Sequence, residues 1–348
     1  GLYIQKTTGG PLVKIFQKSG VRASFQGASD DSRYLYYSAN DKKPSSATLY
    51  RFELASGVSE PLLDEEGTWF VADRWKDQKL LLGKALGNMQ IEFYELDLSS
   101  RKLSPVFGQG KSEEIWMNYG QSDNEYLVQT NMFGNFRRLY VMKDGAFNPI
   151  TPDVKYDVEQ FKVDFNRSMI AVVTDEDGFR KTQILDAKTY TPVEWPKIEA
   201  DHVIAGNFSY NSKFLTLGIE RGNEPRATYV YDFETKELKK WLAASAPEVD
   251  VDSFATATAE TYPARDGTMI PMLVRRPLAC QEPCPVIVHF HGGPEGQASP
   301  GFSTFAQNFV DAGFIYAEPN VRGSDGFGKE WVNADNGAKR LSVITDIE

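Results

Sequence analysis

Short segments in which apolar and polar residues alternate recur through the first two thirds of the chain. Tyr50–Leu54 and Tyr94–Leu98 are two of them, and each places every second side chain on the same face. A period of two is typical of β-strands with one buried face, and it excludes a solenoid of helical repeats. The pattern therefore predicts a chain that begins as an all-β structure.

These strand-like segments are repeated at a constant distance. A series of aliphatic centres is spaced by 43 to 46 residues, a second series made mostly of tyrosines by 43 to 47, and a third series of prolines by 43 or 44. Repetition at this length indicates the blades of a β-propeller, each a four-stranded antiparallel sheet. The series are Leu35, Leu81, Leu127, Ile170 and Leu215; Tyr3, Tyr50, Tyr94, Tyr140, Gln183 and Tyr229; and Pro61, Pro105, Pro149 and Pro192.

The repeat also predicts where each strand lies within a blade. Polar turns such as Asp30–Arg33 join the first and second strands, and Asp144–Gly145 joins a third strand to a fourth. The prolines then fall on the outermost strand, where a missing N–H removes no ladder hydrogen bond. Leu2–Thr7 and Leu12–Phe16 fit the last two strands of a blade that begins upstream. We therefore predict a mainly β chain, with an incomplete β-propeller of about five and a half blades over residues 1–243.

The pattern changes after Ala243–Pro247, which has the composition of a linker. Ala255–Pro263 and Met269–Pro277 predict an antiparallel hairpin. Pro300–Ala312 carries phenylalanines at helical spacing and is followed by a glycine, so it predicts a crossover helix between parallel strands. These are the opening elements of an α/β-hydrolase sheet, and we assign residues 247–348 to the N-terminal portion of such a domain.

One strand of this region leads into a glycine turn. Pro285–Phe290 is apolar apart from His289, and it predicts a buried strand that continues into His-Gly-Gly-Pro at 291–294. In α/β-hydrolases the loop after such a strand supplies a backbone N–H to the developing oxyanion, and glycine allows the close approach. A second short strand, Phe314–Glu318, precedes Asn320–Gly328, which begins Asn-Val-Arg-Gly. His289 is expected to be a core residue.

The His-Gly-Gly-Pro loop and the Asn-Val-Arg-Gly segment about thirty residues later resemble the prolyl oligopeptidase family of serine peptidases, and within it the acylaminoacyl-peptidase-like branch. The resemblance implies a propeller that caps an active site and a hydrolase domain that cleaves short peptides by acyl transfer. It implies no cofactor and no metal. An esterase of the same fold is an alternative that substrate assays would separate.

The resemblance also implies roles for single residues. Gly293 would present its backbone N–H to the oxyanion, and a tight turn without chemistry is the alternative. His291 would order the loop, or would donate to the oxyanion as a tyrosine does in related peptidases. Arg322 would tie its loop to the sheet by ion pairing. Gly292 and Gly323 would be structural.

The chain has no Gly-x-Ser-x-Gly nucleophile elbow. Its three histidines, His202, His289 and His291, precede the place where a nucleophile would follow. We therefore expect the catalytic Ser, Asp and His to lie beyond Glu348, the chain to be cut at both ends, and the isolated chain to be inactive. The hydrolase part would pair with that missing C-terminal part. The rival hypothesis is a non-catalytic propeller binding module with a hydrolase remnant.

Composition narrows the range of partners. A net charge of −10 without a basic stripe argues against nucleic acid and against an anionic membrane surface, so a peptide substrate is the expected partner. No apolar run approaches the roughly 18 residues of a transmembrane helix. Cys280 and Cys284 are too few for a zinc site. They form either a disulfide or two free thiols, and the disulfide would favour a periplasmic or secreted location over the cytoplasm.

Overall fold

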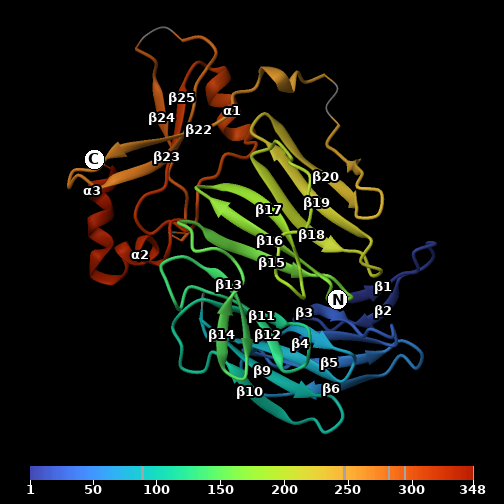
Figure 1. Ribbon diagram of the computed structural model, residues 1–348. Coiled ribbons are helices and arrows are strands. Elements are labelled where there is room, and N and C mark those ends of the chain that lie inside the picture. Colours follow the sequence, from blue (N-terminus) through green and yellow to red (C-terminus); the bar gives the residue numbers. More distant parts are fainter. Residues whose placement is uncertain (88–89, 246–247, 281–282, 294, 348) are drawn as a thin grey trace. The chain divides into compact units, whose positions relative to one another are not determined.

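The computed structural model describes residues 1–87, 90–245, 248–280, 283–293 and 295–347 (Figure 1). Its contacts divide into two compact units, one formed by residues 1–132 and 139–149 and the other by residues 133–138 and 150–348. Part of the predicted linker, at 246 and 247, and the motif residue 294 lie outside the described residues. Both units are mainly β, as predicted.

The first unit contains one two-stranded sheet and three four-stranded antiparallel sheets. In each four-stranded sheet the strands follow one another in chain order, as in a propeller blade. The strands are β1 (Leu2–Ile4) and β2 (Val13–Phe16); β3 (Ala23–Ala28), β4 (Tyr34–Lys43), β5 (Ser46–Glu53) and β6 (Ser59–Leu63); β7 (Thr68–Trp75), β8 (Lys79–Ala85), β9 (Ile91–Asp97) and β10 (Leu103–Phe107); and β11 (Ile115–Tyr119), β12 (Glu125–Thr130), β13 (Arg138–Lys143) and β14 (Ala146–Pro149).

Two of the repeat series turn out to be cross-strand neighbours. The tyrosines lie on the third strand of each sheet, and the prolines lie opposite them on the fourth strand, which is an edge strand in all three sheets. The expected position of the prolines is therefore confirmed for these sheets, and the equal periods of the two series follow from the pairing. The pairs are Tyr50 with Pro61, Tyr94 with Pro105, and Tyr140 with Pro149.

The second unit continues the pattern with seven strands in one sheet. A single parallel bridge between Arg180 and His202 joins its first three strands to its last four. Pro192 forms only an isolated bridge with Leu185, so the fourth strand expected there is reduced to one residue pair. The strands are β15 (Asp157–Val163), β16 (Met169–Glu176), β17 (Phe179–Asp186), β18 (His202–Phe208), β19 (Phe214–Arg221), β20 (Glu224–Asp232) and β21 (Leu238–Leu242).

Hydrogen bonds between residues about one repeat apart link successive repeats within each unit. In the first unit Gln26 accepts from the Val71 amide at 3.1 Å, 45 residues away. In the second unit the side chain of Gln160 donates to the Ala205 carbonyl at 3.0 Å, again 45 residues away. Apolar clusters fill the space between successive repeats, and one cluster of the second unit includes the fully buried Leu217. Burial of such side chains is the main stabilising contribution to these sheets.

A four-stranded mixed sheet follows in the second unit. It has the order β22, β23, β25, β24, and β24 runs parallel to β25. The predicted hairpin and crossover helix are both present: β22 pairs with β23, and α1 connects β24 to β25. The Ser303 hydroxyl caps α1 by accepting from the Ala306 amide. The elements are η1 (Val251–Ser253), β22 (Thr258–Pro263), β23 (Met269–Arg275), β24 (Val286–Val288), α1 (Thr304–Asp311), β25 (Ile315–Pro319), α2 (Lys329–Val332), η2 (Asn333–Asp335), η3 (Gly337–Val343) and α3 (Ile344–Ile347).

The strand β24 differs from the prediction in length and in burial. It covers three residues instead of six, and the side chains of Val286 and Val288 are 52% and 51% exposed. Among the described residues only β25 pairs with it. The expected buried strand is therefore an edge strand in this structure, because burial of both its faces and of its second edge requires further elements.

Candidate functional site

The loop 291–297 makes a turn that only glycine can occupy at position 293. Gly293 has φ +144°, and a Cβ there would lie 2.6 Å from the Gly296 nitrogen and 2.7 Å from the Glu295 nitrogen. A side chain at position 293 would clash with both of these nitrogens and force the backbone apart. Gly292 has no atom within 4 Å of the place of a Cβ, so space alone does not require glycine there.

The ring of His291 joins this loop to the loop after β25. Its Nε2 lies 2.9 Å from the Ser324 hydroxyl, and its Nδ1 lies 3.1 Å from the carbonyl oxygen of Gly292. A neutral imidazole has one proton. With the proton on Nε2, the ring donates to the Ser324 oxygen, whose own proton is directed to the Val321 carbonyl. The ring thus lies between the two loops, an arrangement that suits an ordering role for His291.

The Ser324 hydroxyl is also 2.7 Å from the carbonyl oxygen of Val321. That carbonyl already accepts from the Ser324 amide at 3.0 Å and from the Trp331 indole at 3.0 Å. Because a carbonyl oxygen cannot donate, the hydroxyl proton is directed to Val321, and the hydroxyl oxygen accepts from Nε2 of His291. Ser324 is fully buried, so this contact is shielded from water.

Asn320 is a residue that sequence reasoning missed. It is 2% exposed, its side-chain oxygen accepts from the Ala298 amide at 2.7 Å, and its side-chain nitrogen donates to the Ala298 carbonyl at 3.1 Å. Its own amide donates to the Pro271 carbonyl at 2.8 Å. Asn320 thus holds the end of the glycine loop against β23 and β25. The Asn-Val-Arg-Gly motif contained the signal, but only its arginine and glycine were assigned roles.

Arg322 forms ion pairs with Asp266 and Asp346, as expected for an arginine that fastens its loop. Its Nε donates to Asp346 at 2.8 Å, its Nη1 to Asp266 at 2.7 Å, and its Nη2 to the Thr345 hydroxyl at 2.9 Å. A hydrogen bond from the Thr268 backbone, followed by that from Arg322, lowers the pKa of Asp266 to about 2. Because the Asp346 carboxylate is fully buried, the guanidinium compensates a charge that water cannot reach.

Gly323 makes room for a second buried carboxylate. Its φ is +99°, and a Cβ would lie 2.5 Å from the Cγ of Asp335. Asp335 is 1% exposed and forms an ion pair with Arg340. A larger residue at 323 would displace Asp335 and open the loop.

The expectation for His289 was wrong. Its side chain is 48% exposed, and its Nδ1 lies 3.7 Å from the Glu318 carboxylate. It follows the edge strand β24, so nothing among the described residues covers its outer side. Glu318 in turn forms an ion pair with Arg275, whose side chain is 2% exposed and whose Nη2 donates to the Gly301 carbonyl at 2.7 Å. This buried arginine was also missed by the sequence reasoning.

Cys280 and Cys284 lie close together before β24. Their Cα atoms are 5.7 Å apart, within the usual range for disulfides, and the structure joins their sulfur atoms. Residues 281 and 282, between them, lie outside the described part. The redox state in the natural setting of the protein stays a prediction.

The described residues contain no group of three or more His, Cys, Asp or Glu placed to hold a metal ion. In the same part of the chain, no helix is long and apolar enough to cross a membrane.

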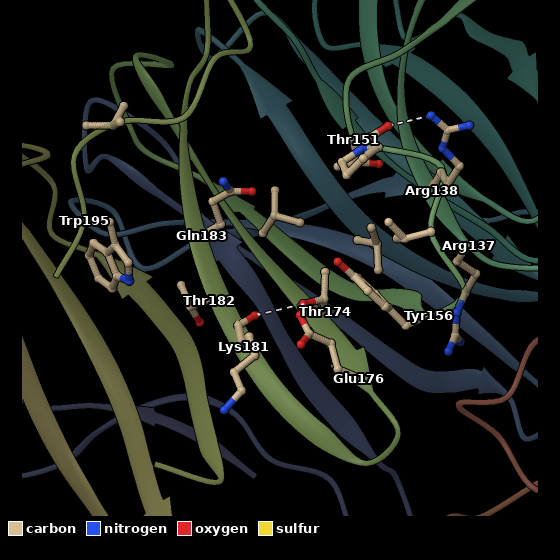
Figure 2. A pocket seen from close by; sticks show the side chains of 15 residues that line it. Arg137, Arg138, Thr151, Tyr156, Thr174, Glu176, Lys181, Thr182, Gln183 and Trp195 are labelled. Atoms are coloured by element: carbon tan, nitrogen blue, oxygen red, sulfur yellow. Dashed lines mark hydrogen bonds between the residues drawn. The ribbon is translucent and has the colours of Figure 1, made fainter. Parts of the chain in front are cut away.

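A cavity of about 470 Å³ lies in the second unit, beside β16 and β17 (Figure 2). Arg138 on its wall donates to the Thr151 carbonyl at 2.6 Å, and Lys181 donates to the Ala200 carbonyl at 2.9 Å. These charged groups are engaged within the protein, and we assign the cavity no ligand.

Curated proteins resemble this chain over most of its length. No family model matches the chain. The prolyl endopeptidase of Elizabethkingia meningoseptica is 33% identical over 95% of this chain and 54% of the relative. The dual function macrocyclase-peptidase POPB of Galerina marginata is 29% identical over 64% of this chain and 34% of the relative. The relatives and structural neighbours of the chain are prolyl endopeptidases and oligopeptidases.

The fold of the chain is shared with solved structures. Prolyl oligopeptidase B from Galerina marginata, bound to a 35mer hydrolysis and macrocyclization substrate, matches with a TM-score of 0.76 at 18% identity, over 96% of this chain and 49% of that chain. The sheets described above match the propeller domain of that family. The chain spans about half the length of the curated prolyl endopeptidases it matches. The acylaminoacyl-peptidase-like branch and the number of blades stay predictions.

Proposed function

We propose that this chain is the N-terminal part of a serine peptidase that hydrolyses short peptides by acyl transfer. The observation that carries the proposal is the turn at Gly293, which excludes any side chain and is fastened through His291 to the buried Ser324. The similarity to prolyl endopeptidases supports an oxyanion role for this turn. Prolyl endopeptidases among the relatives make peptides with an internal proline the first substrates to test.

In this proposal Gly293 donates its backbone N–H to the oxygen of the scissile carbonyl as negative charge develops on it. A donor fixed before the reaction stabilises that charge without reorganising, which is why such donors contribute strongly to rate. His291 keeps the loop in place, and Arg322, Gly292 and Gly323 keep their loops folded. No metal or organic cofactor is required for this chemistry.

The proposal assigns the Ser, Asp and His of the triad to sequence beyond Glu348, because no nucleophile elbow occurs in the chain. Residues 1–243 would form the propeller, with about five and a half blades in this chain, and would cap the active site. Residues 247–348 would form the first part of the hydrolase domain. The open edge of β24 supports this division, since half-exposed Val286 and Val288 would be covered by a further strand.

The proposal is tested on the full-length natural protein and on the 348-residue chain in parallel. A fluorophosphonate probe should label one serine in the full-length protein and none in the 348-residue chain. The full-length protein should also cleave a fluorogenic peptide with an internal proline. Gly293→Ala should lower kcat by roughly 100- to 1000-fold while the probe still labels the serine, or labels it more slowly.

Two results would contradict the proposal. Absence of labelling in a folded full-length protein would favour the non-catalytic binding module. Cleavage of small acyl esters but of no peptide would favour an esterase of the same fold.

A further inference from the structure

Two arginines of the second unit, one in the segment 133–138 and one in a blade strand, reach the loops that carry Gly293 and Ser324. Arg137 immediately precedes β13, and Arg180 lies in β17. Their side chains are 11% and 16% exposed. Neither was singled out by the sequence, because the loop residues they contact are more than 100 positions away in the chain.

Arg137 fastens the loop after β25. Its Nη2 lies 3.1 and 3.3 Å from the two carboxylate oxygens of Asp325. The Asp325 amide donates to the Gly296 carbonyl at 3.0 Å. Gly296 is the residue whose nitrogen lies against Gly293 in the tight turn. A short chain of contacts therefore leads from the blade to the proposed oxyanion donor.

Arg180 fastens the glycine loop itself. Its Nη2 donates to the side-chain oxygen of Gln297 at 2.9 Å, and its Nη1 donates to the Gly178 carbonyl at 2.7 Å. Gln297 precedes Ala298, the residue that Asn320 holds by both backbone groups. The end of the loop is thus fixed from the blade side and from the β25 side.

A third contact comes from Asn135, in the same segment as Arg137. Its side-chain oxygen accepts from the Glu330 amide at 2.8 Å, and its carbonyl accepts from the Lys329 amide at 2.9 Å. Gly328 has φ +84°, and a Cβ there would lie 2.5 Å from the Asn135 side-chain nitrogen. The loop after β25 therefore approaches the blade segment so closely that a glycine is needed.

Both arginines are held by buried carboxylates on the blade. Asp157, 3% exposed, accepts from Arg137 at 3.2 Å, and Asp175, 2% exposed, lies 3.5 Å from Arg180. Paired in this way, each guanidinium is oriented before it meets the loop, and it loses little rotamer freedom in doing so. Charge-assisted hydrogen bonds of this type contribute more than neutral ones.

We propose that Arg137 and Arg180 are positioning residues that hold the loop of Gly293 in the geometry required for oxyanion stabilisation. The inference rests on the proposed function for its chemistry and on the contacts of the second unit for its geometry. Neither arginine would touch the substrate carbonyl. Their role is to make the orientation of one loop depend on the blade strands.

Arg138 provides a matched control, since it lies in the same segment and carries the same charge. Figure 2 shows Arg138 directed toward Thr151 and Arg137 directed away from it. Arg138→Ala therefore removes an arginine from this segment and leaves the loop contacts unchanged. Asp325→Ala removes the loop's partner and leaves the buried pair of Arg137 and Asp157 intact, which keeps the test valid if Arg137→Ala does not fold.

The first measurement is amide hydrogen exchange in the 348-residue chain. Asp325→Ala and Arg137→Ala should speed exchange of the position 325 amide by about 10- to 100-fold, the effect expected from loss of a hydrogen bond to a charged group. Arg138→Ala should leave the exchange rate of the position 325 amide within twofold of the wild type. Exchange within twofold of the wild type in Asp325→Ala, or an equal rise in Arg138→Ala, overturns the proposal.

The second measurement is the kinetics of the full-length protein. Asp325→Ala, Arg137→Ala and Arg180→Ala should lower kcat by about tenfold or more with KM within threefold, and Arg137→Lys should recover part of the loss. A change confined to KM would overturn the positioning role. If the wild type has no peptidase activity, the proposed function fails, and hydrogen exchange still decides whether the arginines hold the loop.

Discussion

The blade sheets and the mixed sheet β22–β25 differ at their edges. The last strand of three blade sheets carries a proline, which removes a donor from the edge, whereas the edge strand β24 is Val-Ile-Val with two half-exposed valines. Both regions combine apolar clusters with buried charge, which lies on Arg275 of β23, Asp335 of η2 and Asp346 of α3 in one and on Asp157 and Asp175 in the other. The blade edges have the features of permanent edges, and β24 has those of an interior strand.

The largest effect should come from the buried charge of the mixed sheet. Arg275→Ala would leave Glu318 without its partner and the Gly301 carbonyl without its donor, and should lower the free energy of unfolding by about 3 to 5 kcal/mol. Urea unfolding of the wild-type and Arg275→Ala forms of the 348-residue chain measures this loss of free energy. Leu217→Ala in the apolar core of the blades, expected to cost about 2 to 5 kcal/mol, is the matched control.

The double variant Arg275→Met with Glu318→Leu sharpens this test. It should recover most of the lost stability, because apolar replacement of a buried ion pair is often neutral or stabilising. A loss below about 1 kcal/mol in Arg275→Ala would mean that this charge is not buried in solution.

His202, a buried residue of the blades, should make stability depend on pH, because the folded chain holds its side chain neutral. Burial, followed by the charge of Arg180, lowers the pKa of His202 from 6.5 to about 4. The unfolded chain therefore takes up a proton below about pH 6.5 that the folded chain refuses, and stability should fall by up to about 3 kcal/mol as the pH drops from 6.5 to 4. Unfolding free energies between pH 4 and 8 should show this slope in the wild type and a reduced slope in His202→Gln.

Asp175 changes the pH dependence of stability in the opposite direction from His202. Burial raises its pKa to about 6, so its folded form gains a proton that the unfolded chain has already lost, and its contribution to stability declines as the pH rises from about 4 to 6. Asp175→Asn should therefore steepen the loss of stability on acidification. Identical slopes in the wild type and both variants would show that neither group titrates as proposed.

The contrast between the edges predicts a difference in association. In the 348-residue chain, Val286→Lys with Val288→Lys should weaken self-association at least tenfold by sedimentation velocity, because charges on an edge strand oppose pairing with another strand. Val58→Lys, at a 60% exposed position beside the blade edge β6, is the control and should have little effect. A wild-type chain that stays monomeric at high concentration would remove the basis for this contrast.

The smallest effect should come from the blade edges themselves. Pro105→Thr restores an edge N–H and increases the entropy of the unfolded chain, so it should lower the free energy of unfolding by about 0.4 to 1 kcal/mol. The same change at Pro149 is the internal comparison. Urea unfolding gives the energy, and a rise in association by sedimentation would support a protective role for the prolines.

Much of the fold could be predicted because its determinants are local. Alternation defined the strands, and the tyrosine and proline series were visible because paired positions such as Tyr94 and Pro105 repeat with the blade. The helix over Thr304–Asp311 and the hairpin before it followed from spacing and turn residues. The reduced strand at Pro192 could not be foreseen, since the proline keeps its place in the series while its neighbours leave the sheet.

The sequence by itself determined which residues form strands and where the glycine turns lie, and the loops of Gly293 and Arg322 carried its resemblance to one family. Only the tertiary structure decided which groups meet there. Asp325 is 188 residues from Arg137 and Glu330 is 195 from Asn135, and no periodicity links such pairs. The burial of β24 was likewise undecidable, because the exposure of a strand depends on the elements packed beside it and not on its own side chains.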